Sequence, residues 1–250
     1  MEARTATELG VEIERLRAEL ERREREAADK ELQLERYAAD LRETFKQERA
    51  YAQELRRSYA ATVRALSNAV EKRDAYTGKH AERVTAYGIE VARAYGLDPA
   101  QCGAMEFGFL LHDIGKLAIP DAILYKPAPL TDEERALVER HPVIGAEIVE
   151  GIEFLGEAAR IVRSHHERWD GGGYPDRLAG QAIPLGARLF AVADVFDALT
   201  TDRPYRPAVD LASARELIAS EASSHFDPDV VSAFGRIGEE TLRRIGAHLR

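Results

Sequence analysis

The chain has 250 residues, of which 45% are apolar and 32% charged, with a formal net charge of -9. This composition predicts a globular protein with a core, and the acidic balance argues against DNA, RNA or membrane surfaces as partners, because these attract dense positive charge. The single cysteine, Cys102, excludes an internal disulfide and favours a reducing, cytoplasmic setting. We find neither an apolar run long enough to span a membrane nor the apolar region of a signal peptide.

The first predicted element is a long helix over residues 1–66. No glycine or proline occurs between Gly10 and Gly78, and Glu, Arg, Ala and Leu dominate. Apolar residues recur there in alternating steps of four and three, which is a heptad pattern. The members of this seam are Leu9, Ile13, Leu16, Leu20, Ala27, Leu34, Tyr37 and Leu41. We expect a parallel coiled coil that forms a homodimer or transmits a signal; the alternative is a single solvated helix.

The second region, residues 67–250, is predicted to be one all-α domain. Few of its segments alternate with period two, and glycine and proline separate shorter helices. The expected helices are 99–116 after a cap at Asp98, one from the capping box at Thr131 through Val138 to His141, 185–199, and one capped by Asp227.

Residues able to carry chemistry gather in this second region. His112 and Asp113 are adjacent, His165 and His166 form a doublet, and Asp194 lies in an otherwise apolar helix. An unpaired carboxylate there would be costly, so a metal centre is the simplest common explanation. The predicted ligands are His80, His112, Asp113, His141, His165, His166 and Asp194.

Seven nitrogen and oxygen donors exceed what one ion takes from a protein, so two divalent ions are expected. The lack of thiolate ligands favours Fe, Mn, Co or Zn. For any single histidine, the alternative is an ordinary hydrogen-bonded residue. His225 and His248 lie outside the constellation, and we treat both as non-ligands.

Three motifs resemble the signature of the HD-GYP phosphodiesterases, a subgroup of the HD metal-dependent phosphohydrolases. They are HDIGK at 112–116, HHERWDGGGYP at 165–175 and DVFDALTTDRPYR at 194–206. The similarity extends over roughly residues 68–237. It implies an HD-type helical domain with an HD-GYP extension, which hydrolyses cyclic di-GMP to pGpG or GMP through a hydroxide activated by two metal ions.

The resemblance also implies individual ligand roles. It places His80, His112, Asp113 and Asp194 among the usual HD ligands, with Asp113 as the bridge, and His141, His165 and His166 as ligands that complete the second site. Fe or Mn is the expected metal, with Zn, Co, Ni and Mg as alternatives. Some relatives hold a third ion through a glutamate four residues before the first histidine; that place is Tyr76 here, so two ions are expected and Glu71 is not assigned.

Substrate contacts follow from the same resemblance. Lys116 would lie beside the scissile phosphate, on the face of a continuing helix that it shares with His112; the alternative is a surface lysine. Arg203 and Arg206 would contact phosphate or guanine, although Arg206 could instead form a surface salt bridge.

The turn of Gly173, Tyr174 and Pro175 would border the cleft, where it would contact substrate or a diguanylate cyclase (GGDEF) partner, or would only close over the domain. Asp197 would orient a ligand or serve the fold. Two other functions remain open: hydrolysis of another nucleotide or cyclic dinucleotide by an HD phosphohydrolase, and a non-enzymatic receptor or scaffold for cyclic di-GMP.

Overall fold

The structure is a computed structural model that describes residues 6–73, 79–98, 102–202 and 206–249. Over these residues the named elements are all helices, and an isolated β-bridge joins Ala222 and Phe226. The all-α prediction is therefore confirmed. No helix in the described part of the chain has both the length and the apolar character needed to span a membrane.

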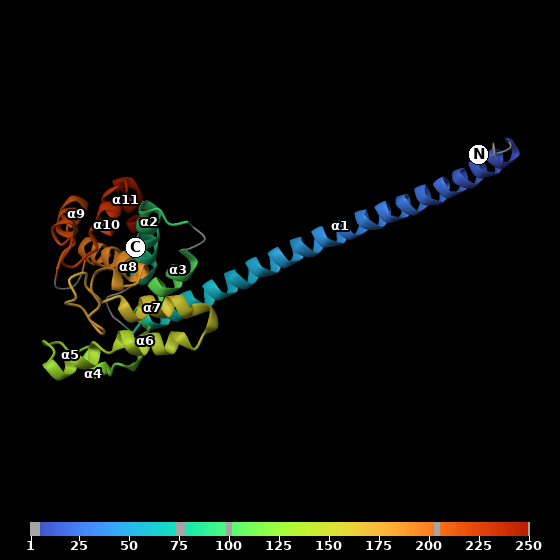
Figure 1. The fold of residues 1–250 in the computed structure, drawn as a ribbon. Helices are drawn as coiled ribbons and strands as arrows, with labels where there is room; N and C mark the ends of the chain where they lie inside the picture. The colour runs from blue at the N-terminus through green and yellow to red at the C-terminus, as the bar shows by residue number, and fades with distance from the viewer. Residues whose placement is uncertain (1–5, 74–78, 99–101, 203–205, 250) are drawn as a thin grey trace. The chain divides into compact units, whose positions relative to one another are not determined.

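Helix α1 runs from Ala6 to Glu71 (Figure 1), which confirms the predicted long N-terminal helix. The chain divides into two compact units, Met1–Tyr59 and Ala60–Arg250, so α1 continues from the first unit into the second. The expected boundary between residues 66 and 67 lies inside this helix.

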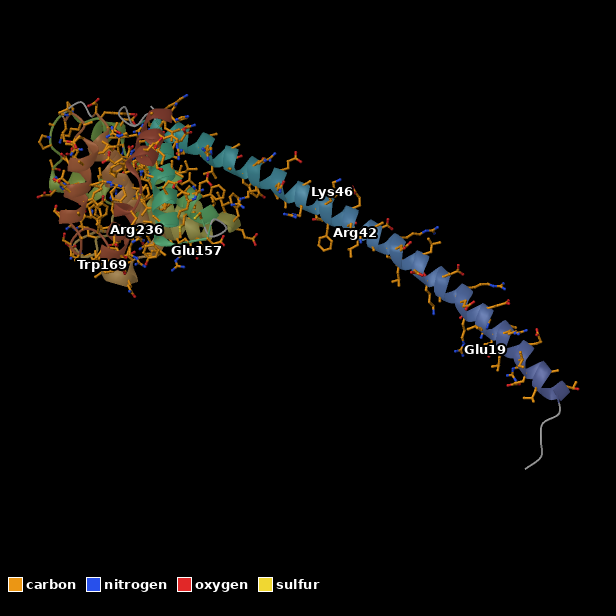
Figure 2. All side chains as sticks on the ribbon, turned by 90° about the horizontal axis from the view of Figure 1, so that it is seen from above. Glu19, Arg42, Lys46, Glu157, Trp169 and Arg236 are labelled. Atoms are coloured by element: carbon orange, nitrogen blue, oxygen red, sulfur yellow. The ribbon has the colours of Figure 1, made fainter. Side chains whose placement is uncertain are left out.

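Within the first unit the side chains of α1 point outward from the helix, including those of Glu19, Arg42 and Lys46 (Figure 2). The apolar seam is exposed in the single chain; Leu16 and Leu20, for example, are 57% and 58% exposed. A seam of this kind is covered only by a partner. The coiled-coil pairing itself stays a prediction.

The second unit consists of short helices that follow the end of α1 (Figure 1). The α-helices are α2 (His80–Tyr95), α3 (Cys102–Leu110), α4 (Asp121–Leu124), α5 (Asp132–Val138), α6 (His141–Glu150), α7 (Gly156–Ser164), α8 (Leu185–Thr200), α9 (Leu211–Ser220), α10 (Pro228–Gly235) and α11 (Glu239–His248). The 3-10 helices are η2 (Ile114–Ala118), η3 (Glu153–Leu155) and η4 (Gly180–Ala182).

Helix α8 lies in the main core, which explains why its sequence is apolar on nearly all sides. Leu189, Phe190, Val192 and Phe196 are fully buried there, among side chains from α2, α9, α10 and α11. A second cluster joins the last turns of α1 to α3, η2, α6 and α7, and α6 and α7 lie side by side (Figure 1). The metal-ligand candidates lie where these two clusters meet, since both contribute the elements that carry them.

Two predicted helices differ from the structure. The helix expected over 99–116 ends at Leu110, and the chain continues through a turn into the 3-10 helix η2. Residues 99–101, with the expected start of that helix, lie outside the described residues. The reason for the break is a close backbone approach, because a Cβ atom at Gly115 would lie 1.9 Å from the carbonyl oxygen of His141.

The capping box at Thr131 is present, but the helix it begins ends at Val138, and His141 begins the separate helix α6. Pro142 gives the physical reason. A proline inside a continuous helix would clash with the carbonyl of Val138, four residues earlier, whereas it is tolerated in a first helical turn. The expected cap at Asp227 is confirmed, since its side chain accepts a hydrogen bond from the backbone of Asp229 at 2.8 Å.

Gly88 sets how closely α2 approaches α3. A Cβ atom at Gly88 would lie 2.5 Å from Cε2 of Phe109, whose side chain is fully buried. We expect Gly88→Ala to lower the free energy of unfolding by about 1–2 kcal/mol, because overpacking costs about 1–3 kcal/mol and the higher helix propensity of alanine offsets up to about 1 kcal/mol.

Urea denaturation followed by circular dichroism measures this effect. Gly151→Ala is the matched control, because a Cβ atom there meets nothing within 4 Å and the backbone φ is -65°. Equal stability of the two variants would contradict the proposed close contact between α2 and α3.

Candidate metal centre

Three of the predicted ligand histidines are held by the same local hydrogen bond. In His112, His141 and His165 the ring Nδ1 lies 2.9, 2.7 and 2.7 Å from the carbonyl oxygen of the residue three positions earlier. These carbonyls belong to Phe109, Val138 and Val162, in the last turns of α3, α5 and α7. Carbonyls in a last helical turn have no intrahelical donor. A bond donated from Nδ1 leaves Nε2 with a free lone pair, which is the arrangement that a metal ligand needs.

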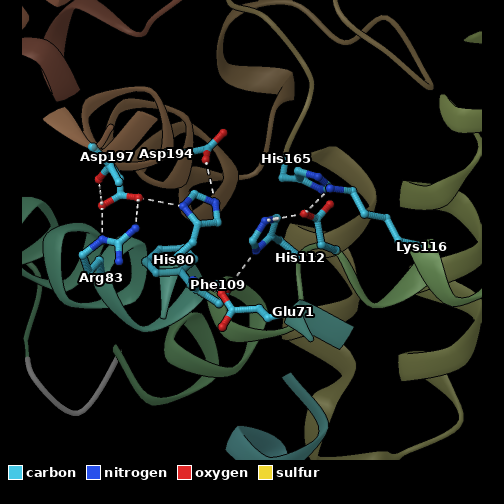
Figure 3. Close-up of polar contacts among 12 residues, drawn as sticks. Glu71, His80, Arg83, Phe109, His112, Lys116, His165, Asp194 and Asp197 are labelled. Carbon is cyan, nitrogen blue, oxygen red and sulfur yellow. Dashed lines mark hydrogen bonds and ion pairs between the residues drawn. The ribbon is translucent and has the colours of Figure 1, made fainter. Parts of the chain in front are cut away.

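His80 is held by a longer-range contact. It is the first residue of α2, and its Nδ1 lies 2.7 Å from Oδ2 of Asp197 on α8 (Figure 3). Arg83 donates from Nε to the other oxygen of Asp197 at 2.6 Å. The two oxygens of one buried carboxylate therefore fix both the ring of His80 and the guanidinium of Arg83, which gives Asp197 an orienting position.

The other ring nitrogen of His80 faces a second carboxylate. Nε2 of His80 lies 3.3 Å from Oδ1 of Asp194 (Figure 3). Burial opposes protonation of His80, but Asp194 and Asp197 outweigh it and raise its pKa to about 10. Burial likewise opposes ionisation of Asp194, yet His80 and the neighbouring histidines lower the pKa of that carboxyl to about 2. The carboxylate of Asp194 is only partly buried, with its side chain 27% exposed, and it is compensated by histidines.

Asp113 lies between two groups of ligand candidates. Its Oδ2 is 3.1 Å from Nε2 of His112 and 2.8 Å from Nζ of Lys116, while its Oδ1 is 3.3 Å from Nε2 of His141. Burial would raise the pKa of Asp113, but the charges of His112 and Lys116 and the hydrogen bonds from both histidines hold it well below the ordinary value. An ionised carboxylate with its oxygens directed to different groups is placed as a bridging ligand would be.

The donor atoms around Asp113 fit a divalent cation. One ligand atom from each of Asp113, His141, His165 and His166 lies within 4.8 Å of all the others. Nε2 of His141 is only 3.3 Å from Nε2 of His165. Burial lowers the pKa of His165 well below its ordinary value and that of His166 to about 4, so both stay neutral at pH 7. Neutral imidazoles facing an ionised carboxylate form an oxygen and nitrogen donor set suited to Fe, Mn, Co or Zn.

The other three candidates, His80, His112 and Asp194, lie beside this group but are not part of the compact cluster. The rings of His80 and His112 are 5.6 Å apart, and those of His112 and His165 are 5.3 Å apart. Asp194 pairs with His80 and lines the same cleft as His165 and His166. All seven predicted ligands thus lie in one region, and four of them form a compact cluster.

Lys116 lies at the site as expected, but on a different kind of helix. The chain does not continue as an α-helix, and Lys116 lies on η2, from which its ammonium group reaches Asp113. His165 and His166 lie just after the last residue of α7, not within it. Both changes leave the side chains at the site.

A cleft of about 410 Å³ opens beside these residues. Its lining includes His166 and Asp194, together with Gly173 and Tyr174 of the predicted turn. It also includes Glu139, Arg168 and His225, which the sequence did not predict as site residues. Arg168 is two positions after the histidine doublet, and this proximity was the available signal for it.

Three other residues considered in the sequence analysis, Pro175, Arg206 and His248, do not line the cleft. The Arg206 guanidinium donates to the carbonyl oxygen of Ala198 and is exposed, and it is not among the residues that line the cleft. Arg203 and Tyr76 lie outside the described residues. Pro175 is partly buried in the turn, and His248 is at the exposed end of α11.

Glu71 lies closer to the site than its sequence position suggested. Its carboxylate accepts a hydrogen bond from the backbone N–H of Ala81 at 2.5 Å, and burial raises its pKa. With His80 and His112 it lines a cavity of about 10 Å³. Because residues 74–78 separate Glu71 from α2, spacing along the chain gave no signal of this contact.

Comparisons with known proteins are consistent with this geometry. The family model described as HD domain matches residues 64–230. The chain is 43% identical over 186 residues to the cyclic di-GMP phosphodiesterase response regulator RpfG of Xanthomonas campestris, covering 74% of this chain and 49% of that protein. It is 40% identical over 180 residues to 3'3'-cGAMP-specific phosphodiesterase 2 of Vibrio cholerae, covering 71% of this chain and 34% of that protein. The chain therefore spans half or less of the length of these relatives.

A solved structure supports the fold. The cyclic GMP-AMP specific phosphodiesterase V-cGAP3 of Vibrio cholerae superimposes with a TM-score of 0.53 at 19% identity, over 74% of this chain and 53% of that chain. At this identity the likeness concerns the helical fold.

Asp197 is expected to set metal affinity through His80. In Asp197→Asn the neutral amide cannot accept from both His80 and Arg83 as the carboxylate does, so metal affinity should fall about 10- to 100-fold, the usual effect of removing a partner that orients a ligand histidine. Competition with a chromophoric chelator measures the affinity of each variant for Mn²⁺.

Asp227→Asn is the matched control, because Asp227 is also buried and paired with an arginine, Arg188, at 2.5 Å. Both variants should lose stability, but only Asp197→Asn should lose metal affinity. Equal Mn²⁺ affinities in the two variants would rule out an orienting role for Asp197.

Proposed function

The chain belongs to the HD domain family, and we propose that it is a metal-dependent phosphodiesterase that hydrolyses cyclic di-GMP. The observation that carries this proposal is the placement of Asp113, whose two oxygens face different histidines, His112 and His141, and the ammonium group of Lys116. Lys116 is partly buried, with its side chain 21% exposed, and a cation beside the cluster could stabilise the charge that grows when a phosphodiester is hydrolysed.

Two divalent ions, with Fe or Mn as the first candidates, would supply Lewis acidity and lower the pKa of a water molecule. We assign His141, His165 and His166 to one ion, His80, His112 and Asp194 to the other, and Asp113 to both. Among these donors, burial favours the neutral form of His165 and His166, and the charges around Asp113 favour its ionised form.

Hydrolysis breaks one P–O bond of the cyclic dinucleotide and adds the elements of water, giving linear pGpG; a second hydrolysis gives GMP. Negative charge grows on the phosphate oxygens as the bond breaks. Lys116, whose Nζ is 2.8 Å from Asp113, is the cation we place beside that phosphate.

The cleft supports recognition of a small nucleotide. Its volume of about 410 Å³ is in the range of ligand sites. The guanidinium of Arg168 donates to Asp170 at 2.7 Å and is a planar group whose remaining donors suit phosphate or a guanine edge, and Val195 adds apolar surface for a base. We therefore add Arg168 to the proposed substrate contacts, beside Gly173 and Tyr174 of the turn.

A second cyclic dinucleotide is a specific alternative substrate. Relatives that are 40% and 35% identical are named 3'3'-cGAMP-specific phosphodiesterases, so similarity alone does not separate guanine from adenine at one position. A receptor that binds cyclic di-GMP without turnover is the non-enzymatic alternative, which the assay below also tests.

We also propose that α1 forms a parallel homodimer. The seam residues of the first unit are exposed, with Leu9, Ile13 and Leu41 at 47%, 49% and 58%, and burying them against a second copy would remove this apolar surface from water. A diguanylate cyclase remains the proposed partner at the turn, where Gly172 and Asp176 are exposed.

The function is tested with protein purified without oxygen. Bound metal is measured by elemental analysis, and cyclic di-GMP, 3'3'-cGAMP and pGpG are followed by chromatography. Lys116→Met should keep its metal but lose about 10²- to 10³-fold in kcat, the usual cost of removing a group that stabilises transition-state charge. Asp113→Ala should lose both bound metal and hydrolysis.

His248→Gln is the control, because His248 is exposed at the end of α11 and its Nδ1 bonds the carbonyl oxygen of Arg244, four residues earlier on the same helix. Tight binding of cyclic di-GMP with no product would identify a receptor. Faster cleavage of 3'3'-cGAMP would move the substrate to the alternative.

The dimer is tested by sedimentation equilibrium. Replacing both Leu16 and Leu20 with Asp places charges in the seam and is expected to give monomers. Val11→Asp is the matched control, because Val11 is 67% exposed and lies off the seam. A monomeric wild-type chain, or a dimer that survives both seam substitutions, would exclude pairing through this seam.

A further inference from the structure

His166 differs from the other histidines at the metal centre in how its ring is held. Each of the other four directs Nδ1 to an oxygen atom at 2.7–2.9 Å. The four acceptors are Asp197 and the carbonyls of Phe109, Val138 and Val162. Neither ring nitrogen of His166 has a hydrogen bond to another described residue, so something else must set the orientation of this ring.

The rings of His165 and His141 also lie near His166, at 4.1 and 5.1 Å between centroids, but the aromatic neighbour from outside the histidine cluster is Tyr174. Its ring centroid lies 4.8 Å from that of His166, with 30° between the ring planes, and its backbone N–H donates to the carbonyl oxygen of His166 at 3.3 Å. Aromatic rings at this separation attract each other in offset arrangements. The tyrosine therefore contacts the histidine through both its ring and its backbone.

Gly173 makes this contact possible. A Cβ atom at Gly173 would lie 2.4 Å from the backbone nitrogen of Arg168 and 2.5 Å from the carbonyl oxygen of His166. Both neighbours are backbone atoms, which cannot move aside as the end of a side chain can. Only glycine lets the turn lie directly against the histidine segment.

Glu167 ties the far end of the turn to the same segment. Its carboxylate accepts hydrogen bonds from the backbone N–H groups of Asp176 at 2.7 Å and Leu178 at 3.0 Å. Glu167 is only 3% exposed, and it directly follows His166 in the chain. Glu167 directly follows the two histidines, but its carboxylate bonds the turn, so we do not count it among the metal ligands.

We propose that the Gly173–Pro175 turn is a positioning element of the metal centre, in which the ring of Tyr174 fixes the orientation of His166 and Glu167 holds the turn in place. This inference rests on the proposed metal centre and gives the turn a role besides contact with substrate or a partner. In this proposal, ring packing by Tyr174 does for His166 what a hydrogen-bond acceptor does for each of the other four histidines.

Three variants separate the possible roles of the turn. Tyr174→Leu removes the ring that packs on His166, and Tyr174→Phe keeps the ring but removes the hydroxyl. Asp176→Asn is the matched control at the residue directly after the turn, since it weakens the ion pair with Arg163, at 2.7 Å, without touching His166.

Each protein is treated with chelator and titrated with Mn²⁺ against a competing chelator, and the visible absorption of the Co²⁺-loaded protein reports ligand geometry. Tyr174→Leu is expected to bind one of its two ions about 10-fold more weakly, with a changed Co²⁺ spectrum. Tyr174→Phe and Asp176→Asn should match the wild type in both measurements.

Glu167→Gln provides a second variant if Tyr174→Leu does not fold, and it should weaken the same ion. Wild-type affinity and spectrum in Tyr174→Leu, or in Glu167→Gln when that variant stands in, would overturn the proposal. Equal losses in Tyr174→Phe and Tyr174→Leu would also overturn it, because the hydroxyl and not the ring would then be responsible. A wild-type protein that binds no divalent ion would refute the metal centre itself.

Discussion

The ionised carboxylate of Asp113 is the constraint on which the arrangement of the second unit depends. Taking this group out of water is costly unless cations and hydrogen bonds compensate for the lost hydration. His112 and Lys116 come from its own segment, but His141 belongs to another helix and must be brought to the opposite oxygen. The close approach of Gly115 to the carbonyl of His141 brings the two segments to that distance.

The histidines around Asp113 are held in two ways. His112, His141 and His165 lie just beyond the ends of α3, α5 and α7, where each bonds a carbonyl three residues earlier, so the orientation of their rings is encoded locally. His80 and His166 depend on distant residues, Asp197 and Tyr174. The local bonds need only a helix that ends at the right residue, whereas the distant contacts require α8 and the turn to be in place.

This distinction explains how much of the site could be predicted from the sequence. The long helix, the helical class and the gathering of seven ligand candidates followed from composition, heptad spacing and polar residues in apolar segments. The break after Leu110 did not, because apolar residues continue through Leu111 and Ile114 and the helix ends for a tertiary reason, the approach of η2 to α6. The role of Glu167 could not be predicted for a similar reason. Its carboxylate accepts hydrogen bonds from backbone N–H groups, and these carry no sequence signal.

The last residues of α1 contact the segments that carry the metal-ligand candidates. Ser67 donates to the carbonyl oxygen of Leu110 at 2.7 Å, two residues before His112, and Glu71 accepts from the N–H of Ala81, next to His80. Just beyond α1, Arg73 donates to the carbonyl oxygen of Leu117 at 2.9 Å, next to Lys116. Because these three bonds reach three segments that carry site residues, a shift of this end of α1 along its axis cannot preserve all of them. The position of the helix end and the geometry of the metal centre are therefore not independent.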